Sequence, residues 1–252
     1  MLTDKEFIRY QRQIMLPEIA EVGQKSLIES SVLIIGCGGL GCAVAMQLAG
    51  AGVGKLVLCD DDVLEESNLH RQLSYRESDL GQPKSEALAK HVRQLNSMVS
   101  VRSVNRRMKF DSLMLEASMA DLVVDCTDNF ATRQQINKAC LAKKTPLVSG
   151  AAIGWDGQLV YFDYQDNGPC YHCLYPFTED SEGGKCSESG VMGPNVNMIA
   201  SLQSMYAIQA LVKPEMIQAG QLMVFDGRTL TQHKFDIAKD DACNICKKGS
   251  KS

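Results

Sequence analysis

The sequence predicts an α/β fold in which a Rossmann-like, mostly parallel sheet is continued by antiparallel strands and carries a zinc knuckle of four cysteines. First, strand-like and helix-like runs alternate between residues 31 and 152, as in a doubly wound parallel sheet. Second, the run GCGGLG at residues 36–41 follows a strand and opens a helix, which is the context of a phosphate-binding turn. Third, two Cys-x-x-Cys pairs lie near residues 170 and 243, and four thiolates are the ligand set of a structural zinc site.

The elements of the first half follow one another at the short spacing that such a sheet requires. Hydrophobic periodicity and helix-boundary residues define them. We expect an opening helix to about residue 14, strands at 31–36, 55–60, 99–105, 120–126 and 146–152, and helices at 41–52, 83–96 and 133–144.

The pattern changes beyond residue 150. Hairpin-type strands are expected at 157–163, 221–227 and 230–237, with an apolar helix at 195–212 between them. The loop at 178–190 is acidic and rich in glycine and serine, so we expect it to be mobile, and we expect the tail at 248–252 to be disordered. We expect one domain over residues 1–252, with a nucleotide-binding part to about 150 and a second part over 151–247.

Composition narrows the class of partner. The formal net charge is -4 and the pI is near 5.6, so the chain lacks the excess of basic residues that is typical of proteins that bind nucleic acid. Small molecules and proteins are therefore the expected partners. Apolar runs are shorter than the roughly 20 residues of a membrane span, and the charged start lacks a signal-peptide pattern. We therefore expect a cytoplasmic protein with no membrane partner.

The ten cysteines divide into two groups. Five lie within apolar strand or helix patterns, where cysteine acts as a small hydrophobic residue: Cys37, Cys42, Cys59, Cys126 and Cys140. The other five lie in polar or glycine-rich surroundings that suit metal binding or thiolate chemistry: Cys170, Cys173, Cys186, Cys243 and Cys246.

Four of this second group form the two Cys-x-x-Cys pairs. The long interval between Cys173 and Cys243 requires only that the end of the chain folds back beside residue 170. An iron–sulfur cluster and a thioredoxin-like redox pair are the alternatives. The redox pair is disfavoured because neither motif is expected to open a helix after a strand.

The glycine-rich turn predicts a nucleotide site. Its glycines let the backbone approach phosphates: Gly36, Gly38, Gly39 and Gly41. Asp60 ends the next strand, which is where a ribose hydroxyl is bound in such folds. The alternative is a glycine turn that is needed only for helix–sheet packing.

Two cations downstream favour a triphosphate over a dinucleotide. Arg71 lies in SNLHRQ and Lys84 in GQPKSEA. A dinucleotide pyrophosphate is held mainly by backbone amides and a helix N-terminus, whereas a leaving pyrophosphate gains from cations. The alternative is that both are solvated surface residues.

Acidic residues also follow a buried strand in DLVVDCTDN. Asp125 and Asp128 lie at its carboxyl end, where such sheets bind ligands and a carboxylate can hold Mg²⁺ against phosphate oxygens. Asp128 as the N-cap of the following helix is the alternative. Cys186, next to Lys185, is a candidate nucleophile, with a bystander surface cysteine as the alternative.

Taken together, the motifs resemble those of the ThiF/MoeB/HesA family, bacterial relatives of ubiquitin-activating enzymes. The resemblance covers nearly the whole chain and rests on RYQRQI, GCGGLG, SNLHRQ, DCTDN, the two Cys-x-x-Cys pairs and GVMGP. It implies an enzyme that binds Mg-ATP and adenylates the C-terminal glycine of a small ubiquitin-like sulfur carrier, releasing pyrophosphate.

The resemblance also implies roles for individual residues. Asp60 would bind the ribose, Asn68, Arg71 and Lys84 would engage the phosphates, and Asp128 would hold Mg²⁺. Gln72 and Asn129 belong to the same nucleotide site. Arg12 resembles an arginine that reaches into the neighbouring subunit's site, which implies a homodimer, and Cys186 matches a loop cysteine that bonds to the carrier during sulfur transfer.

Two branches of the family match different segments. CDDDV, CYHCLYP and VFDGRT resemble the branch that adenylates ThiS for thiamine synthesis, whereas GQPK, VSGAAI and FDYQDNGPCY also resemble the branch that acts on MoaD for molybdopterin. We favour ThiS, with sulfur supplied by another protein. The alternatives from other classes are an NAD-dependent oxidoreductase and a non-catalytic scaffold that binds the carrier.

Overall fold

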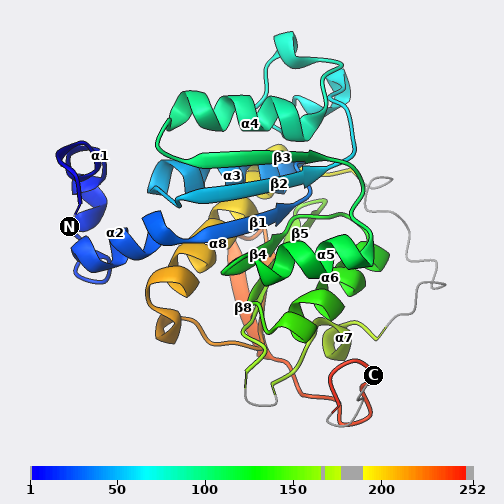
Figure 1. The fold of residues 1–252 in the computed structure, drawn as a ribbon. Coiled ribbons are helices and arrows are strands. Elements are labelled where there is room, and N and C mark those ends of the chain that lie inside the picture. Colours follow the sequence, from blue (N-terminus) through cyan, green and yellow to red (C-terminus); the bar gives the residue numbers. More distant parts are fainter. Residues whose placement is uncertain (1, 166–167, 177–189, 248–252) are drawn as a thin grey trace.

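An eight-stranded sheet in the order β3-β2-β1-β4-β5-β6-β7-β8 forms the centre of the computed structural model (Figure 1). The structure describes residues 2–165, 168–176 and 190–247. Cys186, nearly all of the predicted acidic loop and the tail at 248–252 lie outside these ranges. The strands are β1 (Ser31–Ile35), β2 (Lys55–Asp60), β3 (Ser100–Asn105), β4 (Leu122–Asp125), β5 (Leu147–Ile153), β6 (Asp156–Phe162), β7 (Gln221–Asp226) and β8 (Thr231–Asp236).

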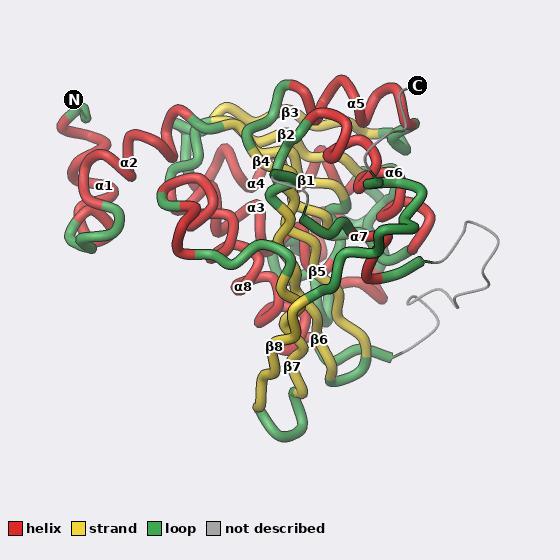
Figure 2. The backbone as a smooth tube through the Cα atoms, turned by 90° about the horizontal axis from the view of Figure 1, so that it is seen from below, coloured by secondary structure: helices red, strands yellow, loops and turns green. Residues whose placement is uncertain are grey.

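The first five strands are parallel and the remaining three are antiparallel, as predicted. β1 pairs in parallel with both β2 and β4, so the order of the strands reverses at this point and leaves a crevice beyond their carboxyl ends. β6, β7 and β8 extend the sheet as a meander. Figure 2 shows the hairpin of β7 and β8 projecting from the body.

Two layers of helices cover the parallel part of the sheet. The α-helices are α1 (Asp4–Ile14), α2 (Ala20–Glu29), α3 (Gly39–Ala51), α4 (Lys84–Leu95), α5 (Phe110–Ser118), α6 (Phe130–Lys143), α7 (Tyr171–Leu174) and α8 (Gly193–Val212). Short 3-10 turns are η1 (Glu66–Asn68), η2 (Glu77–Asp79) and η4 (Pro214–Met216).

Side-chain alternation along β1 explains the two layers. Val32 and Ile34 belong to the hydrophobic cluster under α3, α4 and α8, whereas Leu33 and Ile35 belong to the cluster under α5 and α6. Because successive side chains of a strand point to opposite faces, a continuous apolar run predicts a strand buried on both faces. Replacing Leu33 with Ala would cost about 2–5 kcal/mol of folding free energy.

Three helices were absent from the sequence prediction. α2 begins at Ala20, whose φ is +48°, and no side chain caps it within the described part of the chain. α5 likewise lacks a side-chain cap in the described residues, and α7 has only four residues. Without a capping residue or a long apolar period, these segments give no boundary signal.

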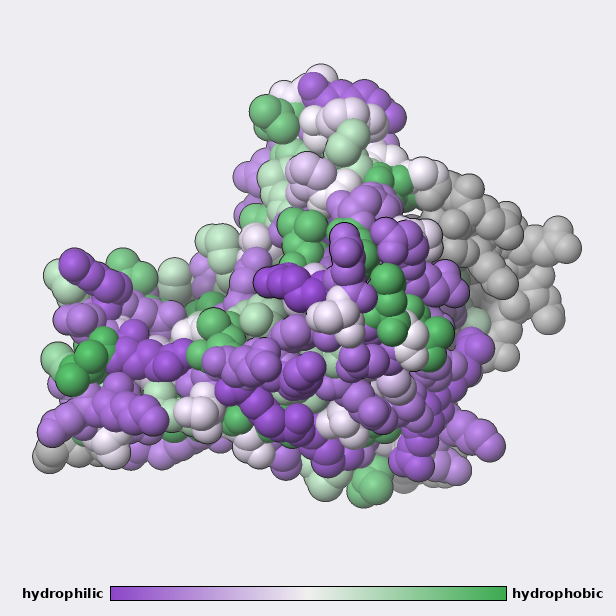
Figure 3. Space-filling model, turned by 90° about the horizontal axis from the view of Figure 1, so that it is seen from above, coloured by the Kyte–Doolittle hydropathy of each residue, from purple (hydrophilic) through white to green (hydrophobic). Residues whose placement is uncertain are grey.

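The helices α1 and α2 form a projection at one end of the molecule, where the Ser26 hydroxyl of α2 donates to the Leu211 carbonyl oxygen of α8 at 2.8 Å. In Figure 1 they lie at the left, on the side where β1, β2 and β3 begin. In Figure 2 they extend outward from the body. Figure 3 shows apolar side chains among polar ones on this projection, at the left of the view. Its exposed apolar residues are Phe7, Ile8, Met15, Leu16 and Val22. In residues 2–165, 168–176 and 190–247, no helix has the combination of length and apolar character that a membrane span needs.

Candidate active site and cysteine cluster

The glycine-rich turn lies at the crevice between β1 and β4, and two of its glycines are fixed by packing. Gly36 has a φ of +89°, and a Cβ there would lie 2.7 Å from the Cys126 carbonyl oxygen after β4. A Cβ at Gly41 would overlap the Gly36 carbonyl oxygen. The turn therefore brings the start of α3 against the end of β4 by excluding side chains.

Packing does not explain the glycine at position 38. In the described part of the chain, a Cβ at Gly38 would meet only the Gln72 Nε2, at 3.7 Å, whereas one at Gly39 would lie 2.6 Å from Val196 Cγ1. Gly38 is the N-cap of α3, and no described side chain caps the helix. The amides of this helix start are thus available to an anion such as a phosphate.

Asp60 is tied to the same turn. Its Oδ2 accepts a hydrogen bond from the Cys37 amide at 2.5 Å, and its Oδ1 accepts one from the Asp62 amide at 2.8 Å. Burial raises the pKa of Asp60 despite these hydrogen bonds and the nearby Lys84. The carboxyl group sits at the end of β2, at the position where a ribose would be bound.

Lys84 is not a solvated surface cation. Its side chain is 8% exposed, and its Nζ lies 2.9 Å from the Oδ2 of Asp62, whose side chain is 68% exposed. The Tyr75 hydroxyl lies 2.7 Å from the Cys37 carbonyl oxygen and 3.2 Å from that of Lys84. Tyr75, which the sequence did not single out, thus holds the start of α4 beside the glycine-rich turn.

Arg71 and Gln72 lie next to the start of α3. A Cβ at Gly39 would lie 3.6 Å from Arg71 Cγ. The Arg71 Nη1 donates to the Ser67 carbonyl oxygen at 3.0 Å and lies 2.8 Å from His70 Nε2. Gln72 is buried, and its Oε1 has no hydrogen-bond partner among the described residues.

Asn68 is also a structural part of its turn. It is buried, and its Oδ1 accepts a hydrogen bond from the Glu65 amide at 3.1 Å. Its carbonyl oxygen accepts from the amides of Arg71 and Gln72. Asn68 therefore orders the segment that presents these two side chains.

The acidic residues after β4 have different environments. Asp125 is buried and accepts hydrogen bonds from the Thr127 amide and hydroxyl and from the Ser149 hydroxyl. Asn129, not Asp128, is the N-cap of α6, accepting from the Thr132 amide at 2.9 Å. The capping alternative for Asp128 is therefore wrong. The Asp128 side chain is exposed, with its Oδ1 3.4 Å from Asn129 Nδ2.

Two buried polar residues that sequence reasoning missed organise this edge of the sheet. Arg133 of α6 donates to the carbonyl oxygens of Thr127 and Gly150. Gln203 of α8 donates to the Asp125 carbonyl oxygen at 2.9 Å and is fully buried. The sequence signal for Gln203 is weak, because it is one of several uncharged polar residues in a largely apolar helix.

Arg12 lies far from the turn in its own chain. It is exposed in the last turn of α1, which packs at the C-terminal end of α3 through Tyr10 and Gly52. With 13 residues, α3 spans about 20 Å. Arg12 is therefore too distant to reach a nucleotide at the start of α3 of the same chain.

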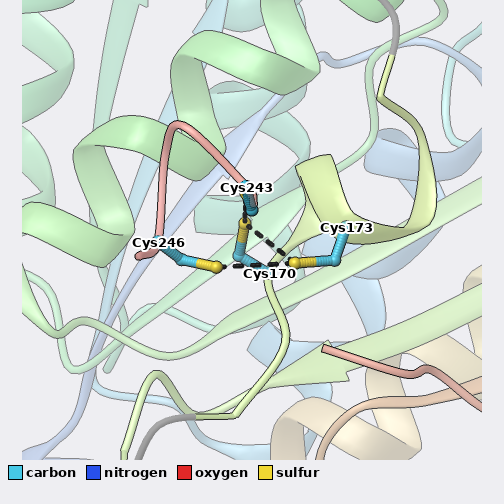
Figure 4. A group of neighbouring side chains, drawn as sticks. All are labelled: Cys170, Cys173, Cys243 and Cys246. Carbon is cyan, nitrogen blue, oxygen red and sulfur yellow. Dashed lines mark hydrogen bonds between the residues drawn. The ribbon is translucent and has the colours of Figure 1, made fainter. Parts of the chain in front are cut away.

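The two Cys-x-x-Cys pairs come together, as predicted (Figure 4). The Sγ atoms of Cys170 and Cys173 are 4.0 Å apart, those of Cys170 and Cys243 3.9 Å, and those of Cys173 and Cys246 3.4 Å. Zn–S bonds of about 2.3 Å place the sulfurs of a tetrahedral site about 3.8 Å apart, so the cluster fits zinc. A disulfide needs about 2.05 Å.

One premise of the sequence prediction is wrong at this cluster. Cys170 is the N-cap of the one-turn helix α7, so the first motif does open a helix, after a loop that follows β6. The convergence of four sulfurs, rather than two, is what favours a metal site over a redox pair. Asn137 Nδ2 lies 3.7 Å from Cys170 Sγ and orients it.

The five cysteines predicted to be structural are all buried. Burial raises the pKa of each thiol: Cys37, Cys42, Cys59, Cys126 and Cys140. Because a thiolate is the reactive form, these side chains are inert packing groups at neutral pH.

Comparison with known proteins agrees with this geometry. The model of the ThiF family matches residues 10–245. The chain belongs to the ThiF family. It is 42% identical over 245 residues to the sulfur carrier protein ThiS adenylyltransferase of Escherichia coli and covers 97% of both chains. It is also 42% identical to the molybdopterin-synthase adenylyltransferase of the same organism, covering 97% of this chain and 98% of that one.

A longer relative and a more distant structure complete the comparison. The adenylyltransferase and sulfurtransferase MOCS3 of Dictyostelium discoideum is 43% identical, and the chain spans 58% of its length. A crystal structure of E. coli MccB with ATP superposes with a TM-score of 0.83 at 22% identity, covering 97% of this chain and 74% of that one, which shows a shared fold. Like its ThiF-family relatives, the chain is an adenylyltransferase.

Proposed function

We propose that this ThiF-family enzyme uses Mg-ATP to adenylate the C-terminal glycine of a ubiquitin-like sulfur carrier protein. The observation that carries the proposal is the uncapped start of α3 at Gly38, flanked by Arg71 and by the buried cation of Lys84. An NAD-dependent oxidoreductase has no use for this cation pair. The names of the relatives also favour adenylyl transfer over a non-catalytic scaffold.

In this reaction an oxygen of the carrier's C-terminal carboxylate attacks the α-phosphorus of ATP. The new O–P bond forms while the bond from the α-phosphorus to the bridging oxygen breaks, and pyrophosphate leaves with that oxygen and its electron pair. No general base is required, because the carboxylate is already ionised at neutral pH. Catalysis is then positioning and stabilisation of charge on the phosphates.

The residues of the site would act on different parts of the bound nucleotide. The start of α3 receives the phosphates, with Arg71, Lys84 and Gln72 beside them, and Asp60 binds the ribose. Asn68 and Asn129 would also contact the nucleotide, and they order the two flanking turns. Asp128 would hold Mg²⁺, which neutralises phosphate charge when it is bound.

A second copy of the chain completes the site in this proposal. The exposed guanidinium of Arg12 lies about the length of α3 away from its own turn. Its action on phosphates therefore requires the site of a neighbouring subunit. The exposed apolar residues of the projection support its burial in a homodimer.

Zinc has a structural role in the proposal. Cys170, Cys173, Cys243 and Cys246 would hold it in a closed tetrahedral site that fixes the end of the chain to α7. With four protein ligands the ion has no open position for a substrate, so it takes no part in adenylation.

ThiS is the carrier that we favour, on the residues CDDDV, CYHCLYP and VFDGRT. MoaD is the second candidate, because the relatives for the two carriers are equally similar to this chain. After adenylation, the Cys186 thiolate would attack the carbonyl carbon of the acyl-adenylate, and AMP would leave as a thioester to the carrier forms, while sulfur arrives from a separate donor protein.

The test is to incubate the protein with Mg-ATP and each of the two carriers and to measure isotope exchange from labelled pyrophosphate into ATP. We expect exchange that depends on the carrier, is greater with ThiS than with MoaD, and survives Cys186→Ala. Exchange with neither carrier would contradict the proposal. Loss of exchange in a folded Cys186→Ala variant would contradict the division into two steps.

A further inference from the structure

The helix that carries Arg12 is anchored to the body by its one buried residue, Tyr10. Its ring occupies the space beside Gly52, where a Cβ would lie 2.5 Å from Tyr10 Cζ. Its hydroxyl accepts a hydrogen bond from Asn96 Nδ2 at 2.8 Å.

Asn96 joins three helices at this point. It is fully buried as the C-cap of α4, and its Nδ2 also donates to the Ala49 carbonyl oxygen of α3 at 2.8 Å. Its Oδ1 accepts from the Met98 amide at 3.2 Å. With both amide atoms engaged, the Asn96 side chain has a fixed orientation, and it fixes Tyr10 in turn.

Two glutamines reinforce the same attachment. Gln13 of α1 and Gln24 of α2 both donate to the Ala51 carbonyl oxygen at the end of α3, at 3.0 and 3.1 Å. Gln13 also donates to Gln24 Oε1 at 2.6 Å. We call the group of Tyr10, Gly52, Asn96, Gln13 and Gln24 the α1 socket.

The α1 socket lies at the far end of both helices that start at the candidate nucleotide site. α3 starts at Gly39 and has 13 residues, and α4 starts at Lys84 and has 12. The socket is therefore about 18–20 Å from the phosphates of the same chain. Its residues cannot touch that nucleotide, whereas Tyr10 is only two positions from Arg12.

We propose that Tyr10 and Asn96 are positioning residues that orient Arg12 toward the nucleotide site of the second copy of the chain. This proposal rests on the proposed function, in which Arg12 acts across a homodimer. Each socket anchors α1 to the C-terminal ends of α3 and α4, so the orientation of Arg12 follows that of the helices that form the subunit's own site. A misplacement of about 1 Å can cost about a hundredfold in rate.

Mixed dimers test the proposal, with carrier-dependent adenylate formation as the measured rate. One copy carries Lys84→Met and the other Arg12→Ala. The one intact site then combines Lys84 of the second copy with Arg12 of the first. We expect Tyr10→Ala to lower kcat roughly tenfold more when it is placed in the first copy, which supplies Arg12, than when it is placed in the second.

A double-mutant cycle gives an independent measurement. In the homodimer we expect Tyr10→Phe to lower kcat a few-fold, since it keeps the ring and removes one hydrogen bond. Tyr10→Ala should add no further loss in the Arg12→Ala background. Tyr164→Phe is the matched control, because it removes another buried tyrosine hydroxyl, bonded to Asn137 Oδ1 at 3.0 Å, and should leave kcat unchanged.

The outcomes separate the two proposals. If the Arg12→Ala homodimer keeps full activity, the role of Arg12 in the proposed function fails, and this inference fails with it. If Arg12→Ala lowers kcat to a small but measurable level and the mixed dimer recovers activity, but Tyr10→Ala acts equally in either copy or adds fully to Arg12→Ala, only the positioning role is overturned. Melting temperature and dimer mass of each variant confirm that the chain is folded.

Discussion

At three glycines near or within α3, the methyl group of an alanine would have different neighbouring atoms. We therefore expect the three alanine substitutions to differ in their effects on stability and ATP binding. Gly41→Ala places a Cβ on the Gly36 carbonyl oxygen, Gly38→Ala places it 3.7 Å from Gln72 Nε2, and Gly50→Ala meets no atom within 4 Å in the described residues. Gly38→Ala is the decisive variant, because its methyl group projects where a phosphate would approach.

The magnitudes follow from these distances. At Gly41 the obstacle is backbone, which cannot rotate away, so we expect a loss of about 3 kcal/mol or more in folding free energy. For a chain of this size that is a fall of roughly 10 °C in Tm. Gly50 lies inside a helix, where alanine is favoured by about 0.5–1 kcal/mol, so Gly50→Ala should raise Tm slightly.

Gly38→Ala should change ligand binding more than stability. Its backbone angles, φ -73° and ψ -148°, lie outside the main regions for alanine, so we expect a strain cost of about 1 kcal/mol and a Tm about 2–4 °C below that of the wild type. ATP binding, measured by calorimetry, should weaken at least about tenfold, which corresponds to 1.4 kcal/mol. Wild-type ATP affinity in Gly38→Ala would refute the placement of the phosphates at the start of α3. An unchanged Tm in Gly41→Ala would refute the packing of the turn.

Three further predictions concern metal, charge and pH. Metal analysis should find one zinc per chain, and Cys246→Ser should lower both zinc content and Tm; full stability without bound metal would contradict the structural role. Lys84→Met should slow adenylate formation by about a hundredfold or more, whereas Lys90→Met, on the exposed side of the same helix, should not; equal effects would make Lys84 a bystander. Burial raises the pKa of Asp79, but hydrogen bonds from His91 and from the Arg76 amide outweigh it and leave the pKa below its ordinary value. The Asp79 carboxylate therefore stabilises the fold above about pH 4, and this stabilisation is lost as the pH falls through the lowered pKa. Asp79→Asn should cost about 2 kcal/mol of folding free energy at pH 7 and progressively less below pH 4. A cost that does not change with pH would contradict this prediction.

The sequence predicted the elements whose signals are local. β1 is a continuous apolar run because it is buried on both faces, and α3 begins at glycines and ends at Gly52, whose φ of +90° suits a C-cap. The four members of the cysteine cluster could also be predicted, since their spacing in pairs is itself the signal.

The rest depends on tertiary contacts that leave no local pattern. Asn129 and Asp128 are both good N-cap residues, and only the direction of the chain after β4 decides between them. Lys84 bonds with Tyr75 through its carbonyl oxygen and with Asp62 through its Nζ, and these two partners lie on separate segments. In the sequence, Tyr10 is one residue of an amphipathic helix pattern. Its packing beside Gly52 is visible only in the folded structure.

The central claim is that this chain joins AMP to the C-terminus of a carrier protein. Intact mass spectrometry of the carrier, after incubation with the enzyme and Mg-ATP, tests it most directly. We predict a carrier whose mass increases by one adenylyl group, no increase when the carrier lacks its C-terminal glycine, and none with Lys84→Met enzyme. An unmodified carrier beside folded, ATP-bound wild-type enzyme would contradict the account.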